Sequence, residues 1–429
     1  SPPPRGSIVA ITLDNVSEIS IISYPRSRYG CLGAWERRRV QRRVLVPEPG
    51  VAERLVEAVQ AQLPSRGGRR VRVFINPAGG AGGAVSAWEK EARPIFEDAG
   101  IASEVTVTTG AGHAGREVAA MELAAVDGIV VVSGDGLLAE VVQALSSRAD
   151  ATAALRTPLG VLPAGSGNAV AMSLLHAAGE HCDVASAAFA VARGSVAPVD
   201  TLTFAQTGRP PIHGVLSLSW GLVADIDIES ERMRWMGGFR FTAQAILRIL
   251  RRRRYGGRVL YLPAAEEAGS VEAAAPDEVA VEMGSGEGVP EGWRVLGGDG
   301  GVDGLWAINL AWGATDMHTA PAARADDGCV HLLLIRGAST LEGFSLLLGM
   351  EKGEHVSNRA VELVKARAFR VEPGMTEGAE GGGFLVVDGE LVAAADPPAD
   401  DGAAPLPFAY APVEARVNPS AARFFALGA

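Results

Sequence analysis

The group best suited to chemistry in this sequence is the carboxylate of Asp135, which stands between Gly134 and Gly136. Glycine has no side chain, so neither neighbour shields this carboxylate. A carboxylate in such a place can accept the proton of an attacking hydroxyl group or help to hold magnesium during phosphoryl transfer. The alternative role is structural, because aspartate often caps a helix, here one that begins near Leu137.

Glycine is abundant, with 53 among 429 residues, and three clusters of it follow predicted strands. Besides Ser133-Gly134-Asp135-Gly136, they are Asn76-Pro77-Ala78-Gly79-Gly80-Ala81-Gly82-Gly83 and Pro163-Ala164-Gly165-Ser166-Gly167-Asn168. A helix is predicted after each cluster, and the first N–H groups and the dipole of a helix favour an anion. A tight turn explains any one cluster, but three at the carboxyl ends of strands in one sheet predict a phosphate site.

Other nucleotide-binding and hydrolase motifs fit the sequence less well. A Walker A loop needs a Gly-Lys pair, which the sequence lacks. The pattern Gly-x-Gly-x-x-Gly occurs at residues 110–115, but Ser133 stands where a dinucleotide-binding fold has an acidic residue. A dinucleotide site therefore remains an alternative, while the absence of Gly-x-Ser-x-Gly removes the usual hydrolase nucleophile.

The elements that would position these loops alternate between strands and helices. Strands are predicted at 71–75, 104–109, 128–133 and 159–163, and helices near 86–99, 114–125, 137–147 and 168–178. This alternation indicates a parallel sheet with helices on both faces, that is, a three-layer α/β nucleotide domain at the N-terminal side. After about residue 195 the runs are strand-like with few helices, and we expect a C-terminal antiparallel β-sandwich domain.

These patterns set the expected domain boundaries. Residues 1–66 are an accessory segment, 67–195 the α/β domain, 196–412 the β-rich domain and 413–429 a C-terminal tail. Within the β-rich domain we expect a disordered acidic insertion at 264–303, because residues 264–291 hold eight acidic residues and no basic one.

Composition excludes some classes of protein. The chain has 39 Lys and Arg residues against 50 Asp and Glu residues, a formal net charge of −11, whereas a general nucleic-acid binder is basic over most of its surface. We therefore expect no nucleic-acid partner. The three cysteines lie far apart, form neither a disulfide framework nor a paired zinc site, and fit a reducing compartment such as the cytoplasm. No apolar run reaches the ~18 residues of a membrane-spanning helix.

At these motifs the sequence resembles the sphingosine kinases, within the diacylglycerol kinase catalytic superfamily. The resemblance runs from about Val71 to Val392 and includes the motifs at 133–142 and 162–169. Its most specific part is the block 216–231 with its continuation to Thr242, which is similar to the lipid-recognition segment of that family. Diacylglycerol and ceramide kinases share the layout, but their third glycine motif usually differs.

The resemblance implies an ATP-dependent kinase that phosphorylates the primary hydroxyl of a sphingoid base to give sphingosine 1-phosphate. Asp135 corresponds to the proposed general base, and Asp227 and Ser217 to residues that engage the lipid substrate. A buried counter-charge suits an ammonium headgroup, because an unpaired buried ion is very costly. Arg234 and Arg240 resemble a pair that reaches the ATP phosphates from the second, lipid-binding domain, where the guanidinium fork matches phosphate oxygens.

Further residues fall at nucleotide-binding positions of the family, namely Asn76, Pro77, Ala78, Gly79, Gly80, Thr108, Ser133, Gly134, Gly136, Glu140, Gly165, Ser166, Gly167, Asp388, Gly389 and Glu390. For Asp388-Gly389-Glu390 the alternative is a plain hairpin turn. Mg²⁺ is expected to bind through the ATP phosphates, with no certain protein ligand. A kinase for ceramide or diacylglycerol remains an alternative, as does a non-catalytic nucleotide- or lipid-binding regulator on the same fold.

The sequence departs from the family where membrane contact is concerned. Basic residues usual in the first glycine cluster are replaced by Ala78, Ala81 and Gly83, and one of two adjacent arginines is Trp235. The arginines between 248 and 258, beside an apolar helical face, offer another surface for an anionic membrane, with a solvated helix end as the alternative. We expect a cytoplasmic protein that associates peripherally with membranes, and we leave open whether it forms a homodimer.

Overall fold

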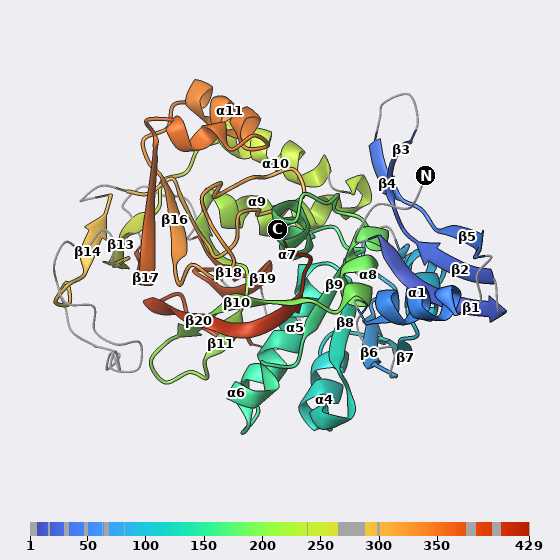
Figure 1. Cartoon of the computed structure of the whole chain (residues 1–429). Coiled ribbons are helices and arrows are strands. Elements are labelled where there is room, and N and C mark those ends of the chain that lie inside the picture. The colour runs from blue at the N-terminus through green and yellow to red at the C-terminus, as the bar shows by residue number, and fades with distance from the viewer. Residues whose placement is uncertain are drawn as a thin grey trace. The chain divides into compact units, whose positions relative to one another are not determined.

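The chain folds into two compact units in a computed structural model (Figure 1), one formed by residues 1–197 with 422–429 and the other by residues 198–421. The structure describes residues 7–15, 18–29, 34–46, 50–61, 63, 68–80, 82–237, 239–264, 288–297, 301–374, 383–396 and 405–428. In these residues no helix has the length and apolar character needed to cross a membrane.

The first unit is built on a parallel sheet in the order β9-β8-β6-β7. Its strands are β6 (Arg70–Ile75), β7 (Ala102–Val107), β8 (Gly128–Ser133) and β9 (Leu159–Pro163). All six residues of the central strand β8 are buried, as expected for a strand covered on both faces. The sequence-based expectation of a parallel α/β sheet is confirmed, and β7 begins and ends two residues earlier than predicted.

Helices connect these strands and cover the sheet (Figure 1). The connection from β6 to β7 holds α2 (Ala84–Ala87), the π-helical turn η1 (Trp88–Ala92) and α3 (Arg93–Asp98), where Trp88 and Phe96 pack edge to face with ring centroids 5.3 Å apart. The other helical segments of this part are α4 (His113–Ala120), η2 (Leu123–Ala125), α5 (Asp135–Ser146), α6 (Ala151–Ala154), α7 (Ala169–Ala177) and α8 (Val184–Arg193).

The accessory segment predicted at residues 1–66 packs within the first unit. It contains the antiparallel strands β1 (Ile8–Asn15), β2 (Glu18–Ser23) and β5 (Val40–Leu45), the hairpin of β3 (Arg26–Tyr29) and β4 (Ala34–Arg37), and helix α1 (Val51–Gln60). Two polar contacts attach it to the α/β core: the Tyr24 hydroxyl donates to Asp98 at 2.6 Å, and Arg37 pairs with Glu180 at 2.7 Å.

The second unit is an antiparallel β-sandwich that also carries helical segments. Its strands are β10 (Val196–Ala205), β11 (Ile212–Gly214), β12 (Ser217–Gly221), β13 (Gly256–Pro263), β14 (Arg294–Leu296), β15 (Gly304–Ile308), β16 (Val330–Ile335), β17 (Val361–Gly374), β18 (Phe384–Val387), β19 (Glu390–Ala394) and β20 (Val413–Phe425). Buried Trp220, Phe369 and Leu332 belong to its core. The helical segments of this part are α9 (Leu222–Ser230), η3 (Glu231–Met236), α10 (Phe239–Leu250), α11 (Thr340–Gly349) and η4 (Glu354–Ser357).

Two of the expected boundaries differ from the structure. The tail expected at 413–429 contains strand β20, which pairs with β17 from Val413 to Arg416. The expected insertion at 264–303 contains strand β14, which pairs with β13 and follows the buried Trp293. Residues 265–287, which hold most of its acidic residues, lie outside the described part of the chain.

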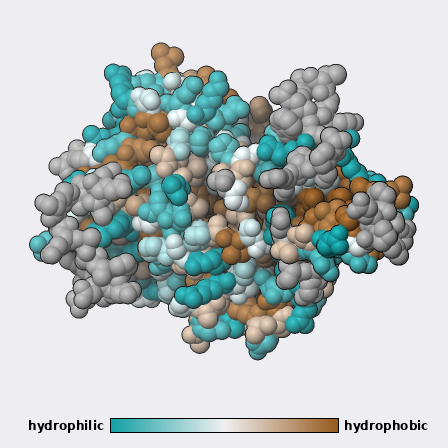
Figure 2. Space-filling model, viewed as in Figure 1, coloured by the Kyte–Doolittle hydropathy of each residue, from teal (hydrophilic) through white to brown (hydrophobic). Residues whose placement is uncertain are grey.

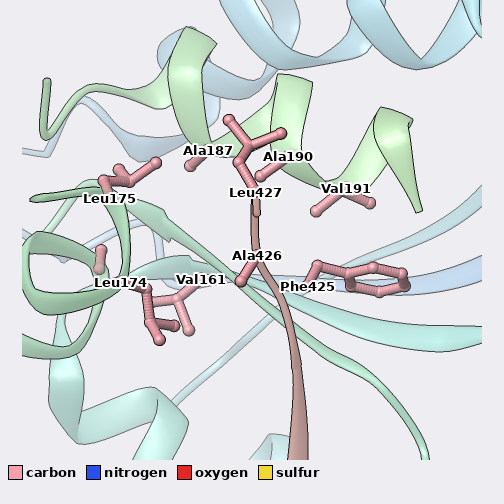
Figure 3. A pocket seen from close by; sticks show the side chains of 10 residues that line it. Val161, Leu174, Leu175, Ala187, Ala190, Val191, Phe425, Ala426 and Leu427 are labelled. Atoms are coloured by element: carbon pink, nitrogen blue, oxygen red, sulfur yellow. The ribbon is translucent and has the colours of Figure 1, made fainter. Parts of the chain in front are cut away.

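The end of the chain belongs to the core of the first unit. Phe424 pairs in parallel with Leu159 of β9, and the Ala426 N–H donates to the Ser195 carbonyl at 3.0 Å. Beyond β20, apolar side chains from β9, α7, α8 and the chain end line a small pocket, into which Leu427 points (Figure 3). The terminal residues therefore have a structural role behind the strand that carries the third glycine loop.

Candidate active site

The three glycine clusters meet at one edge of the sheet of the first unit. The Ala164 N–H donates to the Ser133 carbonyl at 3.1 Å, and the Asp135 N–H donates to the Gly167 carbonyl at 3.1 Å. The Asn76 N–H reaches the Val132 carbonyl at 3.2 Å. Thr108, which follows β7, is buried and donates its N–H to the neighbouring strand β6. The predicted nucleotide-binding residues of this unit are thus brought together.

Glycine is required where these loops touch. A Cβ atom on Gly165 would lie 2.2 Å from the Cα atom of Gly134, and one on Gly134 would lie 2.4 Å from the Gly167 carbonyl oxygen. Gly80 has a φ of +56°, and a Cβ there would lie 3.1 Å from the Ala164 carbonyl oxygen. The backbones are packed against one another while Ser166 remains exposed, so main-chain groups stay accessible to a ligand.

The carboxylate of Asp135 caps a helix other than its own. One oxygen accepts the Ala169 N–H at 2.8 Å and the other accepts the Val170 N–H at 3.1 Å, both at the start of α7. Burial raises the pKa of Asp135, and these backbone hydrogen bonds oppose the rise. The capping expected for the helix near Leu137 is therefore found at α7, and the same carboxylate joins the second glycine loop to the helix after the third.

The carboxylate of Glu140 occupies the start of α4. It accepts the Gly112 N–H at 2.9 Å and the Gly115 N–H at 2.7 Å. These N–H groups belong to the Gly-x-Gly-x-x-Gly pattern, so a carboxylate fills the position that a dinucleotide pyrophosphate would need. The dinucleotide alternative is accordingly disfavoured. A nucleotide contact of Glu140 stays a prediction, because its described partners are backbone groups of its own unit.

Two asparagines shape the loops. The Asn76 side chain accepts the Ala78 N–H at 3.0 Å, which closes a turn in the first loop. Asn168 accepts the Gly165 N–H at 3.0 Å and donates to the Gly165 carbonyl at 2.9 Å. This role of Asn168 was not predicted, although an asparagine three residues after a glycine and just before a helix is a recognisable turn signal.

In the second unit the predicted substrate residue Asp227 lies on α9 in a charged setting. Burial raises its pKa to about 7; nearby Arg240 lowers it, while Glu231 and Glu390 raise it. Arg240 forms an ion pair with Glu231, and its guanidinium lies 4.3 Å from the centre of the Phe241 ring. The pairing of Glu231 with Arg240 was not predicted from the sequence.

Arg234 lies on η3, the segment after α9. Arg240, the other member of the predicted pair, lies near the start of α10, the next helix along the chain.

The segment Asp388-Gly389-Glu390 contains the hairpin turn between β18 and β19. Asp388 has a φ of +48° and Gly389 one of +86°. The Asp388 carboxylate accepts the N–H groups of Val215 at 2.8 Å, Leu216 at 3.0 Å and Ser217 at 2.8 Å. The structure therefore shows the hairpin alternative directly, and it places Ser217 beside this turn. A nucleotide contact for the exposed Glu390 stays a prediction.

The arginines between 248 and 258 are mostly engaged within the second unit. Arg248 is buried and pairs with Asp225 and, at 3.4 Å, with Glu229. Arg258 pairs with Glu372. These two arginines are therefore neutralised within the unit, and a basic membrane surface along the run stays a prediction for the exposed Arg251, Arg252 and Arg254.

Among the described residues, no three His, Cys, Asp or Glu side chains lie together in a group that could hold a metal ion. Mg²⁺ is commonly bound by one or two carboxylates together with substrate phosphates. Such a site fits a phosphate loop with a single carboxylate nearby, which is what Asp135 and its neighbouring glycines provide.

Comparisons with known proteins identify the domains and the relatives of this chain. Residues 70–204 match the diacylglycerol kinase catalytic domain, and residues 306–424 match the YegS C-terminal NAD kinase beta sandwich-like domain. Sphingosine kinase 2 of Arabidopsis thaliana is 38% identical over 336 residues, which cover 76% of this chain and 69% of that protein. Sphingosine kinase 1 of Homo sapiens is 37% identical over 339 residues, 75% of this chain and 86% of that protein.

A solved structure supports the fold. The crystal structure of a diacylglycerol kinase from Bacillus anthracis str. Sterne superposes with a TM-score of 0.55 at 16% identity. The superposition covers 84% of this chain and 97% of the bacterial one.

Proposed function

Because the chain belongs to the sphingosine kinase family, we propose that it is an ATP-dependent lipid kinase that phosphorylates the primary hydroxyl of a sphingoid base. The observation that carries this proposal is the convergence of three glycine loops on one sheet edge, with the carboxylate of Asp135 among them. Phosphoryl transfer relies mainly on positioning and charge neutralisation, and such loops supply main-chain donors for both.

In the proposed reaction, the substrate hydroxyl oxygen forms a bond to the γ-phosphorus of ATP while the bond from that phosphorus to the β–γ bridging oxygen breaks, which releases ADP. The hydroxyl proton moves to a carboxylate oxygen of Asp135. Burial raises the pKa of this carboxylate, which makes it a better proton acceptor than an exposed aspartate. Mg²⁺ on the ATP phosphates would neutralise part of their charge when bound.

Asp227 is the proposed counter-charge for the sphingoid ammonium group. Among the carboxylates of α9, that of Asp227 shows no side-chain hydrogen bond to the described residues. The nearby Arg240 is already paired with Glu231. The carboxylates of Glu231 and Glu390 add negative potential around it. A cationic headgroup would stabilise the ionised form of Asp227, so binding and deprotonation should support each other.

Membrane contact is proposed to use apolar side chains more than basic ones. Large hydrophobic residues of η3 and α11 are strongly exposed: Trp235 by 83%, Leu341 by 82% and Leu348 by 80%. Figure 2 shows apolar atoms among hydrophilic ones over the region of α11. Exposed tryptophan and leucine side chains on helices can insert at a lipid interface. The lipid nature of the proposed substrate gives the protein a reason to approach such an interface.

The direct test is to incubate the purified protein with labelled ATP, Mg²⁺ and each of sphingosine, dihydrosphingosine, phytosphingosine, ceramide and diacylglycerol. Label in sphingosine, dihydrosphingosine or phytosphingosine, but in neither ceramide nor diacylglycerol, supports the proposal. Label chiefly in ceramide or diacylglycerol would identify a kinase for another lipid, and retention of ATP binding without any lipid product would identify a regulator.

A further inference from the structure

We propose that Asp225 is a positioning residue for the headgroup site, and that a buried ionic network around it holds α9 and α10 in the one arrangement that presents Asp227 and Arg240. This inference rests on the proposed function, because it assigns these two residues to substrate and phosphate binding. None of the motifs singled out in the sequence assigns a role to Asp225.

The network joins α9 to the end of α10 and to the segment after it. One carboxylate oxygen of Asp225 accepts hydrogen bonds from Arg248, from the Tyr255 hydroxyl and, at 3.0 Å, from Arg253. Glu229, one turn further along α9, lies 3.2 Å from Arg253 and accepts the side-chain N–H of Gln244 at 2.6 Å. Two carboxylates thus face two guanidinium groups.

The network and the proposed headgroup site occupy opposite sides of α9. Successive residues of an α-helix are rotated by about 100°, so Asp225 and Asp227 point roughly 200° apart. Asp225 faces Arg248, whereas the groups that shift the pKa of Asp227 are Arg240, Glu231 and Glu390. Asp225 therefore cannot assist through contact with the same ligand, and its influence must pass through the placement of α9.

The same network also fixes α10, the helix that carries Arg240. Arg248 lies eight residues after Arg240 on this helix, a separation of about 12 Å along the axis. At the other end of α10, Arg240 pairs with Glu231, the first residue of η3. The helix is thus anchored by ion pairs near both ends, and a shift at the Arg248 end would move Arg240.

Stability alone is a poor explanation for this arrangement. The Asp225 side chain is 0% exposed and that of Arg248 is 6% exposed, and a buried ion pair can often be replaced by apolar residues without loss of stability. In addition, the second carboxylate oxygen of Asp225 is buried and has no hydrogen-bond partner among the described residues. What the network offers instead is a unique arrangement of two helices, since three donors converge on one oxygen.

The test compares two double variants of the full chain. In Asp225→Leu/Arg248→Met, apolar side chains replace the pair at the centre of the network. In Arg370→Met/Glu414→Leu, they replace a control pair at 2.9 Å, whose side chains are 7% and 6% exposed and which joins β17 to β20 in the same unit. We expect the network variant to raise the KM for sphingosine about tenfold through misplacement of Asp227, and to raise the KM for ATP through misplacement of Arg240, with kcat changed less than either KM. The control variant should keep the wild-type KM.

A folded network variant with the wild-type KM would overturn the proposal, and so would an equal rise in both double variants. If the network variant does not fold, Arg253→Met tests the same network at its most exposed arginine, whose side chain is 33% exposed. A smaller rise in the KM for sphingosine at unchanged kcat is expected there, and an unchanged KM would contradict the proposal.

Amide hydrogen exchange without substrate separates this inference from the proposed function. Faster exchange in α9 of the network variant, but not of the control, supports the positioning role even if the wild-type protein phosphorylates no sphingoid base. Unchanged exchange in α9 counts against the positioning role whatever the substrate is.

Discussion

The substitution Asp135→Asn separates the chemical role of this residue from its structural one. Both carboxylate oxygens accept backbone N–H groups of α7, from Ala169 at 2.8 Å and Val170 at 3.1 Å. Asparagine has one acceptor oxygen, so it can satisfy only one of these donors, and its NH₂ group then faces the other. The variant should therefore lose part of the α7 cap as well as the proton acceptor.

The two losses differ in size. A lost capping interaction costs about 1–2 kcal/mol, and the loss of negative charge at a helix N-terminus costs about 0.3–1 kcal/mol. Burial raises the pKa of Asp135, so a neutral amide also removes a desolvation cost, and we expect a net loss near 1–2 kcal/mol in the free energy of unfolding. Removal of a general base lowers kcat by about 10²–10⁴-fold.

The assay measures kcat with sphingosine, the KM for ATP and the thermal midpoint. Asp183→Asn is the matched control, because Asp183 caps α8 in the same unit by accepting the Ser186 N–H at 2.6 Å. Both variants should unfold at a somewhat lower temperature, but only Asp135→Asn should lose turnover while it retains ATP binding. Wild-type kcat in Asp135→Asn would refute the base assignment, and a comparable loss in Asp183→Asn would show that the effect is structural.

Three further sets of substitutions test Asp227, the packing of the glycine loops and the exposed leucines of α11. Asp227→Asn should raise the KM for sphingosine much more than that for a neutral lipid acceptor. Because burial raises the pKa of Asp227 to about 7, this carboxylate ionises as the pH rises through neutrality. The KM of the wild-type protein for sphingosine should therefore fall over this pH range, while the KM of the variant stays constant. An equal rise in the KM for sphingosine and in the KM for the neutral lipid would refute the ion-pair assignment. Gly165→Ala should raise the KM for ATP at least tenfold by forcing the second and third loops apart. Gly428→Ala in the same unit, where the space around the added Cβ is open, should leave this KM unchanged. An unchanged KM in Gly165→Ala would contradict the loop packing. Leu341→Ser/Leu348→Ser should weaken sedimentation with neutral phosphatidylcholine vesicles, with kcat on detergent-dispersed sphingosine unchanged, and undiminished vesicle binding would exclude α11 as the contact surface.

The sequence predicted the parts of the fold that depend on short-range pattern. Strands 128–133 and 159–163 agree with β8 and β9 because short, mainly apolar runs lead directly into the glycine clusters that follow them. Strand β20 was missed because Asn418-Pro419-Ser420 interrupts its pattern and its partner β17 lies about fifty residues earlier in the chain. Pairing over such a separation leaves little local signal.

In the candidate site too, features that depend on local sequence pattern were predictable, and features that depend on distant partners were not. Three glycine loops could be placed at one edge because parallel strands share their carboxyl ends. The partners of individual charges could not be predicted: Asp135 binds a helix that starts 34 residues later, and Arg248 binds Asp225, 23 residues earlier. Arginine is rarely buried without an acidic partner, and the sequence around Arg248 shows no such partner, so a solvated position was expected. The partner is brought to Arg248 only by the fold.

The measurement that tests the central claim most directly is phosphate transfer from γ-labelled ATP to sphingosine by the purified protein, with the product identified by mass. We predict a product one phosphoryl group heavier than sphingosine, modified on the primary hydroxyl, and its absence with Asp135→Asn. No labelled sphingosine from the folded wild-type protein with ATP and Mg²⁺, or equal labelling by the variant, would contradict the account.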